Sequence, residues 1–135
     1  MLILMTHGNF AEGILHSAQM IIGEIKNTYT ICVQPEMSPE AVEEQFNTIA
    51  SAAQDGENIV VMVDIISGTP CNVALRNSKK YKNYTIVSGL NLALLIQYAL
   101  DETSEKISDR VEYAIEEGKR QMMNVTETFN QQMNQ

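Results

Sequence analysis

One histidine in this sequence has neighbours that suit it for nucleophilic chemistry. His7 follows the apolar run Leu2–Met5, and a second apolar run, Ile59–Val63, ends at Asp64. An imidazole can act as a nucleophile near neutral pH. A carboxylate that accepts a hydrogen bond from one ring nitrogen fixes the tautomer, leaves the other nitrogen with its lone pair, and stabilises the cation that forms. If the fold brings His7 to Asp64, the pair predicts an imidazole able to attack phosphorus.

The segment SGTPCN, residues 67–72, supplies groups that complement such a nucleophile. Gly68 allows the backbone to come close to a ligand. The Thr69 hydroxyl and the free N–H groups at the start of a helix offer donors to an anion. We expect Thr69 to cap this helix and Pro70 to be its first residue. The segment therefore predicts an anion cradle beside the imidazole.

Other motifs with a defined chemistry are missing from the sequence or favour a structural role. Neither GxxxxGK[ST] nor GxGxxG is present, so the pattern favours neither ATP nor a dinucleotide. Cys32 and Cys71 form no CxxC motif, which does not favour a metal site. We expect His16 to be a surface residue and Cys71 to be a packing residue. A redox role for Cys71 remains an alternative, and it predicts loss of function in Cys71→Ser. We expect no cofactor and no metal.

Four short strands alternate with amphipathic helical segments along residues 1–100. This βαβα order predicts an α/β fold, a flavodoxin-like open parallel sheet of about four strands with helices on both faces. The carboxyl ends of parallel strands share one edge, and strands one and three would be neighbours there. Three polar or glycine-rich segments would meet at that edge: Thr6–Gly8, Asp64–Asn72 and Ser88–Asn91.

The last part of the chain differs in character. From Thr103 to about Asn130, charge rises and apolar residues recur every three or four positions. This spacing predicts a long amphipathic helix of about seven turns. We expect a domain over residues 1–102 and a helical extension over residues 103–135 that packs on the core or on a dimer partner.

Composition excludes several classes of function. The chain has 135 residues and a formal net charge of -8, which argues against binding to nucleic acid or to an anionic membrane surface. The apolar fraction of 44% is enough for a core. No stretch reaches the roughly 18 apolar residues of a membrane span, and MLILM lacks the features of a signal peptide. We expect a cytoplasmic protein with reduced thiols.

Three segments together resemble a known family. LILMTHGNFAEGILHSAQMIIG, VDIISGTPCNVAL and VSGLNLALL are similar, in order and spacing, to the IIA component of the mannose family of the bacterial sugar phosphotransferase system. The resemblance covers about residues 1–100. It implies a protein-histidine phosphotransferase component that accepts a phosphoryl group from the carrier HPr on His7. That group then passes to a IIB component, which phosphorylates sugar through membrane IIC and IID subunits.

The resemblance also implies roles for the residues at the sheet edge. Asp64 orients His7, and the Thr69 hydroxyl with nearby backbone amides holds the phosphoryl oxygens. The relatives imply a homodimer, and we expect IIB to be a separate chain. Besides Thr69, the candidate phosphoryl-binding residues are Gly8, Ser67, Gly68 and Asn72.

The sequence departs from the family pattern in three places, and two related functions stay open. Ser67-Gly68 stands where many members have Gly-Gly, and Ala93 where many have Pro. We see no fifth strand after Leu100, although some relatives exchange one across a dimer. The open alternatives are the phosphotransfer subunit of a dihydroxyacetone kinase system and a non-catalytic regulatory module of the same fold.

Overall fold

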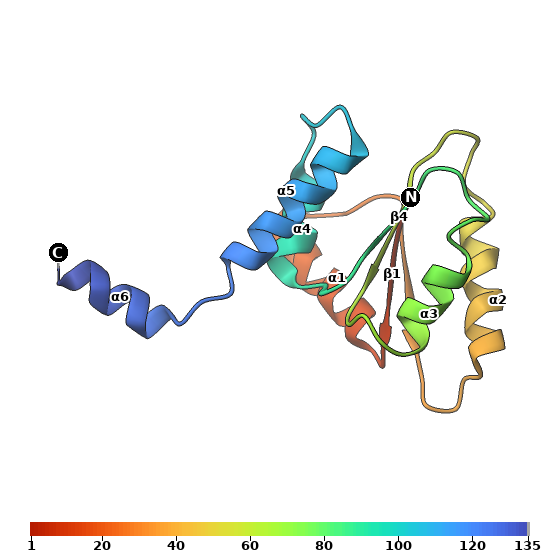
Figure 1. Ribbon diagram of the computed structural model, residues 1–135, viewed down its shortest axis with the longest axis horizontal. Coiled ribbons are helices and arrows are strands. Elements are labelled where there is room, and N and C mark those ends of the chain that lie inside the picture. Colours follow the sequence, from red (N-terminus) through yellow and green to blue (C-terminus); the bar gives the residue numbers. More distant parts are fainter. Residues whose placement is uncertain (135) are drawn as a thin grey trace. The chain divides into compact units, whose positions relative to one another are not determined.

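The computed structural model describes residues 1–134 and contains one four-stranded parallel sheet (Figure 1). The chain divides into two compact units, Met1–Leu92 and the residues from Ala93 onward. The sheet lies in the first unit, and its strand order is β2-β1-β3-β4. The predicted fold class is confirmed. The strands are β1 (Leu2–His7), β2 (Thr28–Val33), β3 (Ile59–Val63) and β4 (Tyr84–Val87).

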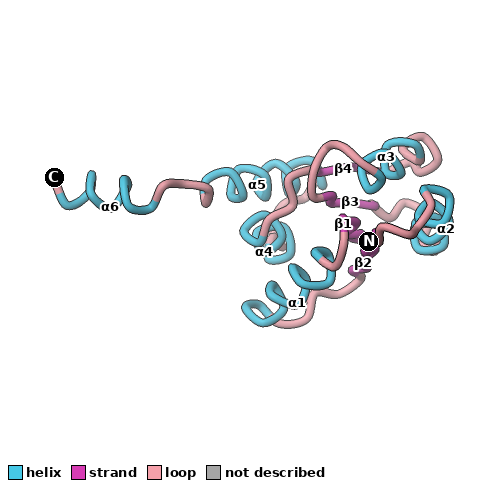
Figure 2. Tube along the Cα trace, turned by 90° about the horizontal axis from the view of Figure 1, so that it is seen from below, coloured by secondary structure: helices cyan, strands magenta, loops and turns pink. Residues whose placement is uncertain are grey.

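Three helices of the first unit cover both faces of the sheet. Helix α1 (Phe10–Ile22) lies on one face, and α2 (Pro39–Ala50) and α3 (Thr69–Arg76) lie on the other (Figure 2). Single residues with capping side chains or a positive φ determine where these helices begin and end. The Ser38 hydroxyl caps α2 by accepting a hydrogen bond from the Ala41 amide at 3.1 Å. Gly23 ends α1 with a positive φ of 84°, a conformation that glycine adopts readily.

One hydrophobic core cluster fills the space between the sheet and helices α2 and α3. Because side chains alternate across a strand, Ile3 and Met5 of β1 point to this face. Phe46 of α2 is fully buried there, and its ring meets Tyr81 and Tyr84 edge-on at centroid distances of 6.3 and 6.4 Å. All five residues of β3 are buried. This pattern explains why the inner strands read as continuous apolar runs rather than as alternating ones.

The strand order positions the candidate site. The chain leaves β1 toward β2 on one side, and β3 then returns to pair with β1 on its other side. Met5 is paired with Val63, so His7 and Asp64 both follow that pair at the carboxyl edge of the sheet. Ligands of open α/β sheets bind at this kind of switch point. The predicted neighbourhood of strands one and three is confirmed.

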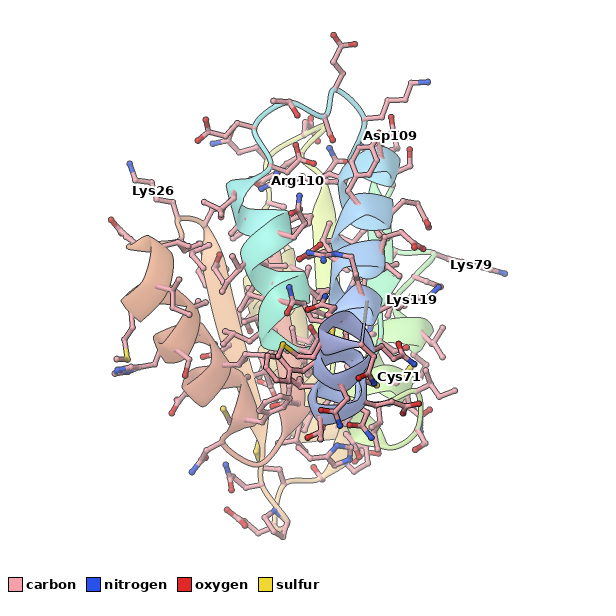
Figure 3. The ribbon with its side chains drawn as sticks, turned by 90° about the vertical axis from the view of Figure 1, so that its left-hand side faces the viewer. Lys26, Cys71, Lys79, Asp109, Arg110 and Lys119 are labelled. Carbon is pink, nitrogen blue, oxygen red and sulfur yellow. The ribbon has the colours of Figure 1, made fainter. Side chains whose placement is uncertain are left out.

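The second unit is helical. Its helices include α4 (Leu92–Leu100) and α5 (Ile107–Arg120), and Figure 3 shows Arg110 beside both. Arg110 of α5 links the two helices, because its Nε donates to the Tyr98 carbonyl of α4 at 2.8 Å. The Arg110 guanidinium also lies 4.0 Å from the centre of the Tyr98 ring, a cation–π geometry. Among residues 1–134, none of the helices has the length and apolar character needed to cross a membrane.

The predicted C-terminal helix is present, but it is not continuous. It forms α5 and a separate short helix, α6 (Val125–Met133). The break has a local cause, because the Asn124 side chain accepts a hydrogen bond from the Glu127 amide at 3.1 Å and so caps a new helix. Apolar residues resume at helical spacing after the break, so their periodicity does not reveal it.

Replacing Phe46 with alanine should destabilise the first unit by about 3–5 kcal/mol, because it leaves a cavity under α2. Urea unfolding measures this loss. The matched control is Gln45→Ala, one residue earlier on the exposed side of the same helix; it should change the free energy of unfolding by less than about 0.5 kcal/mol. A Phe46→Ala protein as stable as the control would contradict the packing described.

Candidate functional site

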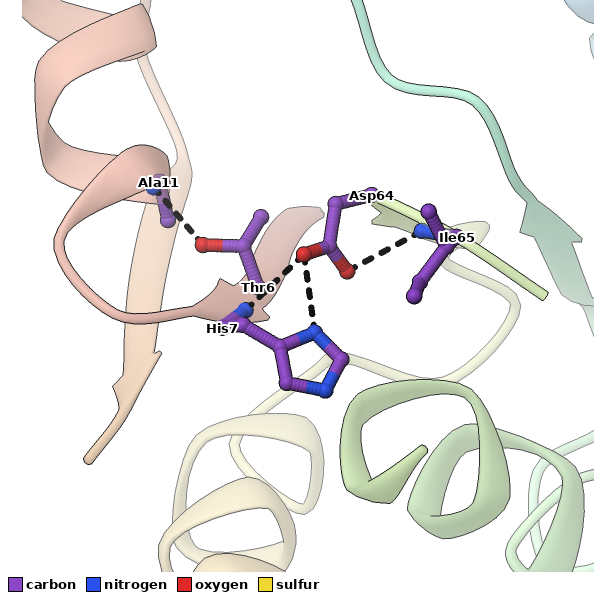
Figure 4. A network of polar contacts seen from close by, with 5 residues as sticks. All are labelled: Thr6, His7, Ala11, Asp64 and Ile65. Carbon is purple, nitrogen blue, oxygen red and sulfur yellow. Dashed lines mark hydrogen bonds and ion pairs between the residues drawn. The ribbon is translucent and has the colours of Figure 1, made fainter. Parts of the chain in front are cut away.

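The candidate site is built on two hydrogen bonds from His7 to one oxygen atom. His7 is the last residue of β1, and Asp64 follows directly after β3. The ring Nδ1 of His7 lies 2.9 Å from Asp64 Oδ2, and the His7 backbone N–H donates to the same oxygen at 3.1 Å (Figure 4). With Nδ1 carrying the proton toward the carboxylate, the lone pair of the neutral ring is on Nε2.

The two side chains of the pair differ in exposure. The His7 side chain is 47% exposed, whereas that of Asp64 is 15% exposed. A reacting group can therefore reach the imidazole, while the carboxylate that orients it stays largely covered. This division suits a nucleophile held by a positioning acid.

The surroundings of Asp64 favour its ionised form. Burial is the largest single effect and raises the pKa of this carboxyl. The hydrogen bond from the His7 ring, those from the His7 and Ile65 amides, and the charge of the ring act in the opposite direction. Together they hold the pKa of Asp64 below its usual range. The carboxylate is therefore available as an acceptor at neutral pH.

Gly68 lies against the Nε2 edge of the His7 imidazole. A Cβ atom at this position would be 2.6 Å from Nε2 and 2.8 Å from Cε1 of His7. Gly68 also has a φ of 88°, a conformation that side-chain-bearing residues rarely adopt. Both features require glycine, and they bring the start of α3 next to the free ring nitrogen.

The structure corrects the predicted cap of α3. Gly68, not Thr69, is the N-cap residue, and its carbonyl accepts the first helical bond from the Asn72 amide at 3.0 Å. Thr69 is the first helical residue and makes no cap bond, and Pro70 is the second. The amides of Thr69 and Cys71 have no hydrogen-bond partner within residues 1–134. They are the donors that α3 offers near the ring.

The other predicted phosphoryl-binding residues divide into two groups. Ser67 and Asn72 are exposed, on the loop before α3 and on its first turn. Gly8 is different, because its amide already donates to the Val33 carbonyl at 2.8 Å. With a φ of 58°, Gly8 turns the chain after His7. Its amide is therefore not available to hold an anion.

The third predicted segment, Ser88–Asn91, supports the site through its backbone. The Gly89 amide donates to the Asp64 carbonyl at 3.1 Å, and the Leu90 amide donates to the Val63 carbonyl at 3.1 Å. These bonds join the residues that follow β4 to the end of β3. They hold the backbone of Asp64 in place.

Two contributors to the site lie within the predicted segments, but no role was predicted for either of them. The Ile65 amide donates to Asp64 Oδ1 at 3.0 Å, and the Thr6 hydroxyl oxygen accepts from the Ala11 amide at 2.8 Å (Figure 4). A backbone donor such as that of Ile65 leaves no signal in the residue types. Thr6 does leave one, because it is a hydroxyl residue at the end of an otherwise apolar run.

The remaining candidates occupy structural positions. His16 is exposed on α1. Cys71 is 5% exposed and belongs to the core cluster between the sheet and helices α2 and α3. Within the described residues 1–134, no group of three or more His, Cys, Asp or Glu side chains is arranged to hold a metal ion.

Comparison with known proteins identifies the family. The EIIA-man family model, described as "PTS system fructose IIA component", matches residues 1–115. The chain belongs to the EIIA-man family. EIIA-man proteins are phosphotransferase-system components, so the resemblance inferred from the three sequence segments is confirmed.

Curated relatives of this EIIA-man chain include mannose- and sorbose-specific components. It is 27% identical over 119 residues to the mannose-specific EIIAB component of Escherichia coli. The matched segment is 87% of this chain but only 37% of that protein. The chain thus spans little more than a third of the length of that relative. It is also 27% identical to the sorbose-specific EIIA component of Lacticaseibacillus casei, over 83% of this chain and 80% of that protein.

Solved structures agree with the family assignment. The mannose/sorbose specific IIA subunit from Enterococcus faecalis superposes with a TM-score of 0.84 at 32% identity, covering 91% of this chain and 92% of the other. The EIIA component from Streptococcus agalactiae gives a TM-score of 0.83 at 29% identity, covering 93% and 96%. The fold of this EIIA-man chain is therefore that of its solved relatives over almost its whole length.

The pKa of Asp64 should rise in His7→Ala, because this variant removes the ring hydrogen bond and the ring charge. A carboxyl ¹³C titration by NMR measures the shift directly. In the wild type the folded pKa lies below the unfolded value of about 3.9. Asp64 therefore stabilises the fold above about pH 4, and this contribution is lost as the pH falls through the folded pKa. An Asp64 pKa that is the same in both proteins would show that His7 does not act on the carboxylate.

Proposed function

We propose that this chain is a phosphohistidine relay protein that accepts a phosphoryl group from phospho-HPr on His7 and passes it to a IIB component. The observation that carries the proposal is the His7–Asp64 pair, with Nδ1 bound to the carboxylate and Nε2 at the exposed edge beside Gly68. Membership of the EIIA-man family supports the same role. The sugar is then phosphorylated downstream through IIB and the membrane IIC and IID subunits.

In the proposed transfer, covalent bonds form and break only between two imidazole rings and the phosphoryl group. The Nε2 lone pair of His7 forms a bond to phosphorus while the N–P bond of phospho-HPr breaks, and its electron pair returns to the donor ring. The His7 ring becomes cationic during this step, and the Asp64 carboxylate stabilises that charge through Nδ1–H. Such transfers pass through a loose transition state, so positioning and donors to the oxygens do most of the work.

The start of α3 is the proposed holder of the phosphoryl oxygens. Its Thr69 and Cys71 amides have no partner within residues 1–134, and the positive end of the helix dipole favours an anion there. The hydroxyl groups of Thr69 and Ser67 and the amide group of Asn72 add further donors. Gly68 contributes by leaving room for the phosphoryl group on Nε2.

We also propose a cytoplasmic homodimer in which residues 1–102 form the phosphoryl-transfer domain and residues 103–135 contribute to the dimer contact. Helix α6 supports this, because none of its residues is buried and three large apolar side chains repeat every four positions along it. These side chains are Val125, Phe129 and Met133, all exposed. An apolar stripe of this kind is stable in water when a partner covers it.

The first test is incubation of the chain with phospho-HPr. We expect acid-labile, base-stable phosphate on His7, with no labelling of His7→Ala and full labelling of the control His16→Ala.

Asp64→Asn should fold but accept the phosphoryl group about 10²-fold more slowly than the wild type, because the ring loses its orienting anion. Cys71→Ser should keep near-normal transfer. An unlabelled wild type, or an Asp64→Asn protein as fast as the wild type, would contradict the proposal.

Gly68→Ala tests the space beside Nε2. The new Cβ would occupy the position in which phosphorus must approach, so we expect phosphorylation to fall by at least about 10²-fold. Gly89→Ala is the matched control. Gly89 has a similar φ of 79°, but a Cβ there meets nothing within 4 Å. Both variants place an alanine at a positive φ that side-chain-bearing residues rarely adopt, so equal phosphorylation rates in the two would show that the space beside Nε2 does not limit the reaction.

Phe129→Ser tests the dimer contact. The wild type should elute as a dimer in size-exclusion chromatography with light scattering, and Phe129→Ser should shift it toward the monomer. Asn130→Ser, on the next residue of the same exposed helix, is the control and should stay dimeric. A monomeric wild type would refute the proposed dimer without affecting the phosphoryl-transfer proposal.

A further inference from the structure

Thr6 is a fully buried polar residue immediately before the proposed nucleophile. It has 0% of its surface exposed, whereas the His7 side chain is 47% exposed. Successive side chains of a strand point to opposite faces. Because Ile3 and Met5 face α2 and α3, His7 shares that side, and Thr6 points toward the face covered by α1.

The Thr6 hydroxyl does for α1 what an N-cap side chain usually does. Its oxygen accepts a hydrogen bond from the Ala11 amide, on the second residue of the helix, at 2.8 Å. Asn9, which occupies the N-cap position, makes no side-chain cap bond. Its Oδ1 instead accepts a hydrogen bond from Gln34 Nε2 at 2.9 Å. The first turn of α1 is therefore tied to the strand rather than to its own cap residue.

This bond closes a small loop that contains His7. It joins the residue before His7 to the residue four positions after it. Inside the loop, the His7 amide donates to Asp64 and the Gly8 amide donates to Val33. The backbone of His7 is thus held on the α1 side by Thr6, toward β3 by Asp64 and toward β2 by the next amide.

We propose that Thr6 is a positioning residue of the phosphoryl-transfer site, an inference that rests on the proposed function. By anchoring the start of α1 to β1, it fixes the turn after His7, so that the ring and the backbone N–H of His7 reach the same carboxylate oxygen. A role limited to capping α1 would affect stability alone. A positioning role also affects the rate of transfer in molecules that are folded.

The test compares Thr6→Val, which keeps the shape but removes the hydroxyl, with Thr6→Ser, which restores it. Ser38→Ala is the matched control, because it removes the cap bond to the Ala41 amide at the start of α2. Phosphorylation by phospho-HPr is measured per folded molecule, with the folded fraction taken from urea unfolding. Thr6→Val should be about tenfold to a hundredfold slower than the wild type. Thr6→Ser and Ser38→Ala should be within about twofold of it.

A second measurement needs no phosphoryl donor. In amide hydrogen exchange followed by NMR, the His7 N–H should exchange faster in Thr6→Val than in Ser38→Ala at matched global stability. If Thr6→Val does not fold, hydrogen exchange of the wild type tests the inference instead. The Ala11 and His7 amides of the wild type should then have the same protection factor, because one loop holds both.

The outcomes separate this inference from the proposed function. A wild type that accepts no phosphoryl group refutes the proposed function. The amide hydrogen-exchange measurement still tests the role of Thr6 in that case. A Thr6→Val protein that matches the wild type in rate per folded molecule overturns the inference. Unrelated protection factors for the wild-type Ala11 and His7 amides overturn it as well.

Discussion

The site depends on one oxygen atom, Asp64 Oδ2, which accepts hydrogen bonds from both the ring and the backbone of His7. One bond alone would leave the imidazole free to rotate or the strand end free to move. Two bonds from the same residue fix both. The carboxylate is itself held, because the Ile65 amide binds its other oxygen and the Gly89 amide binds its carbonyl. The remaining nitrogen therefore has a defined direction, toward Gly68 and the start of α3.

This interaction requires β1 and β3 to be neighbours, and that part of the fold was predictable. Alternating apolar runs and amphipathic segments indicate a doubly wound parallel sheet, in which the chain reverses its direction of growth after the second strand. Met5 and Val63 are then paired, and His7 and Asp64 follow. The local hydrogen bond by which Asn124 caps a new helix, and so interrupts the predicted one, was not predictable. The C-terminal segment keeps its apolar period across the break at Asn124, so periodicity alone indicates a single helix.

The side chains of the site were predictable from the sequence, whereas the roles of its backbone groups were not. His7 and Asp64 were found because an imidazole and a carboxylate follow two apolar runs. Thr69 was expected to cap α3, but the left-handed backbone of Gly68 moves the cap one residue earlier. Gly8 belongs to the same motif as His7, yet its amide is used in the sheet, so its role is to turn the chain. Residue types indicate which groups are available, but only the fold shows which amides are already bonded.

The most direct test of this account is to identify which ring nitrogen of His7 carries phosphorus. After phosphorylation by phospho-HPr, NMR of the ¹⁵N-labelled imidazole distinguishes the two nitrogens by their couplings to phosphorus and to the ring protons. We predict an N–P bond at Nε2, with the proton retained on Nδ1 toward Asp64. Phosphorus on Nδ1 would mean that the carboxylate does not hold that nitrogen during the reaction, and it would contradict the mechanism proposed for this protein.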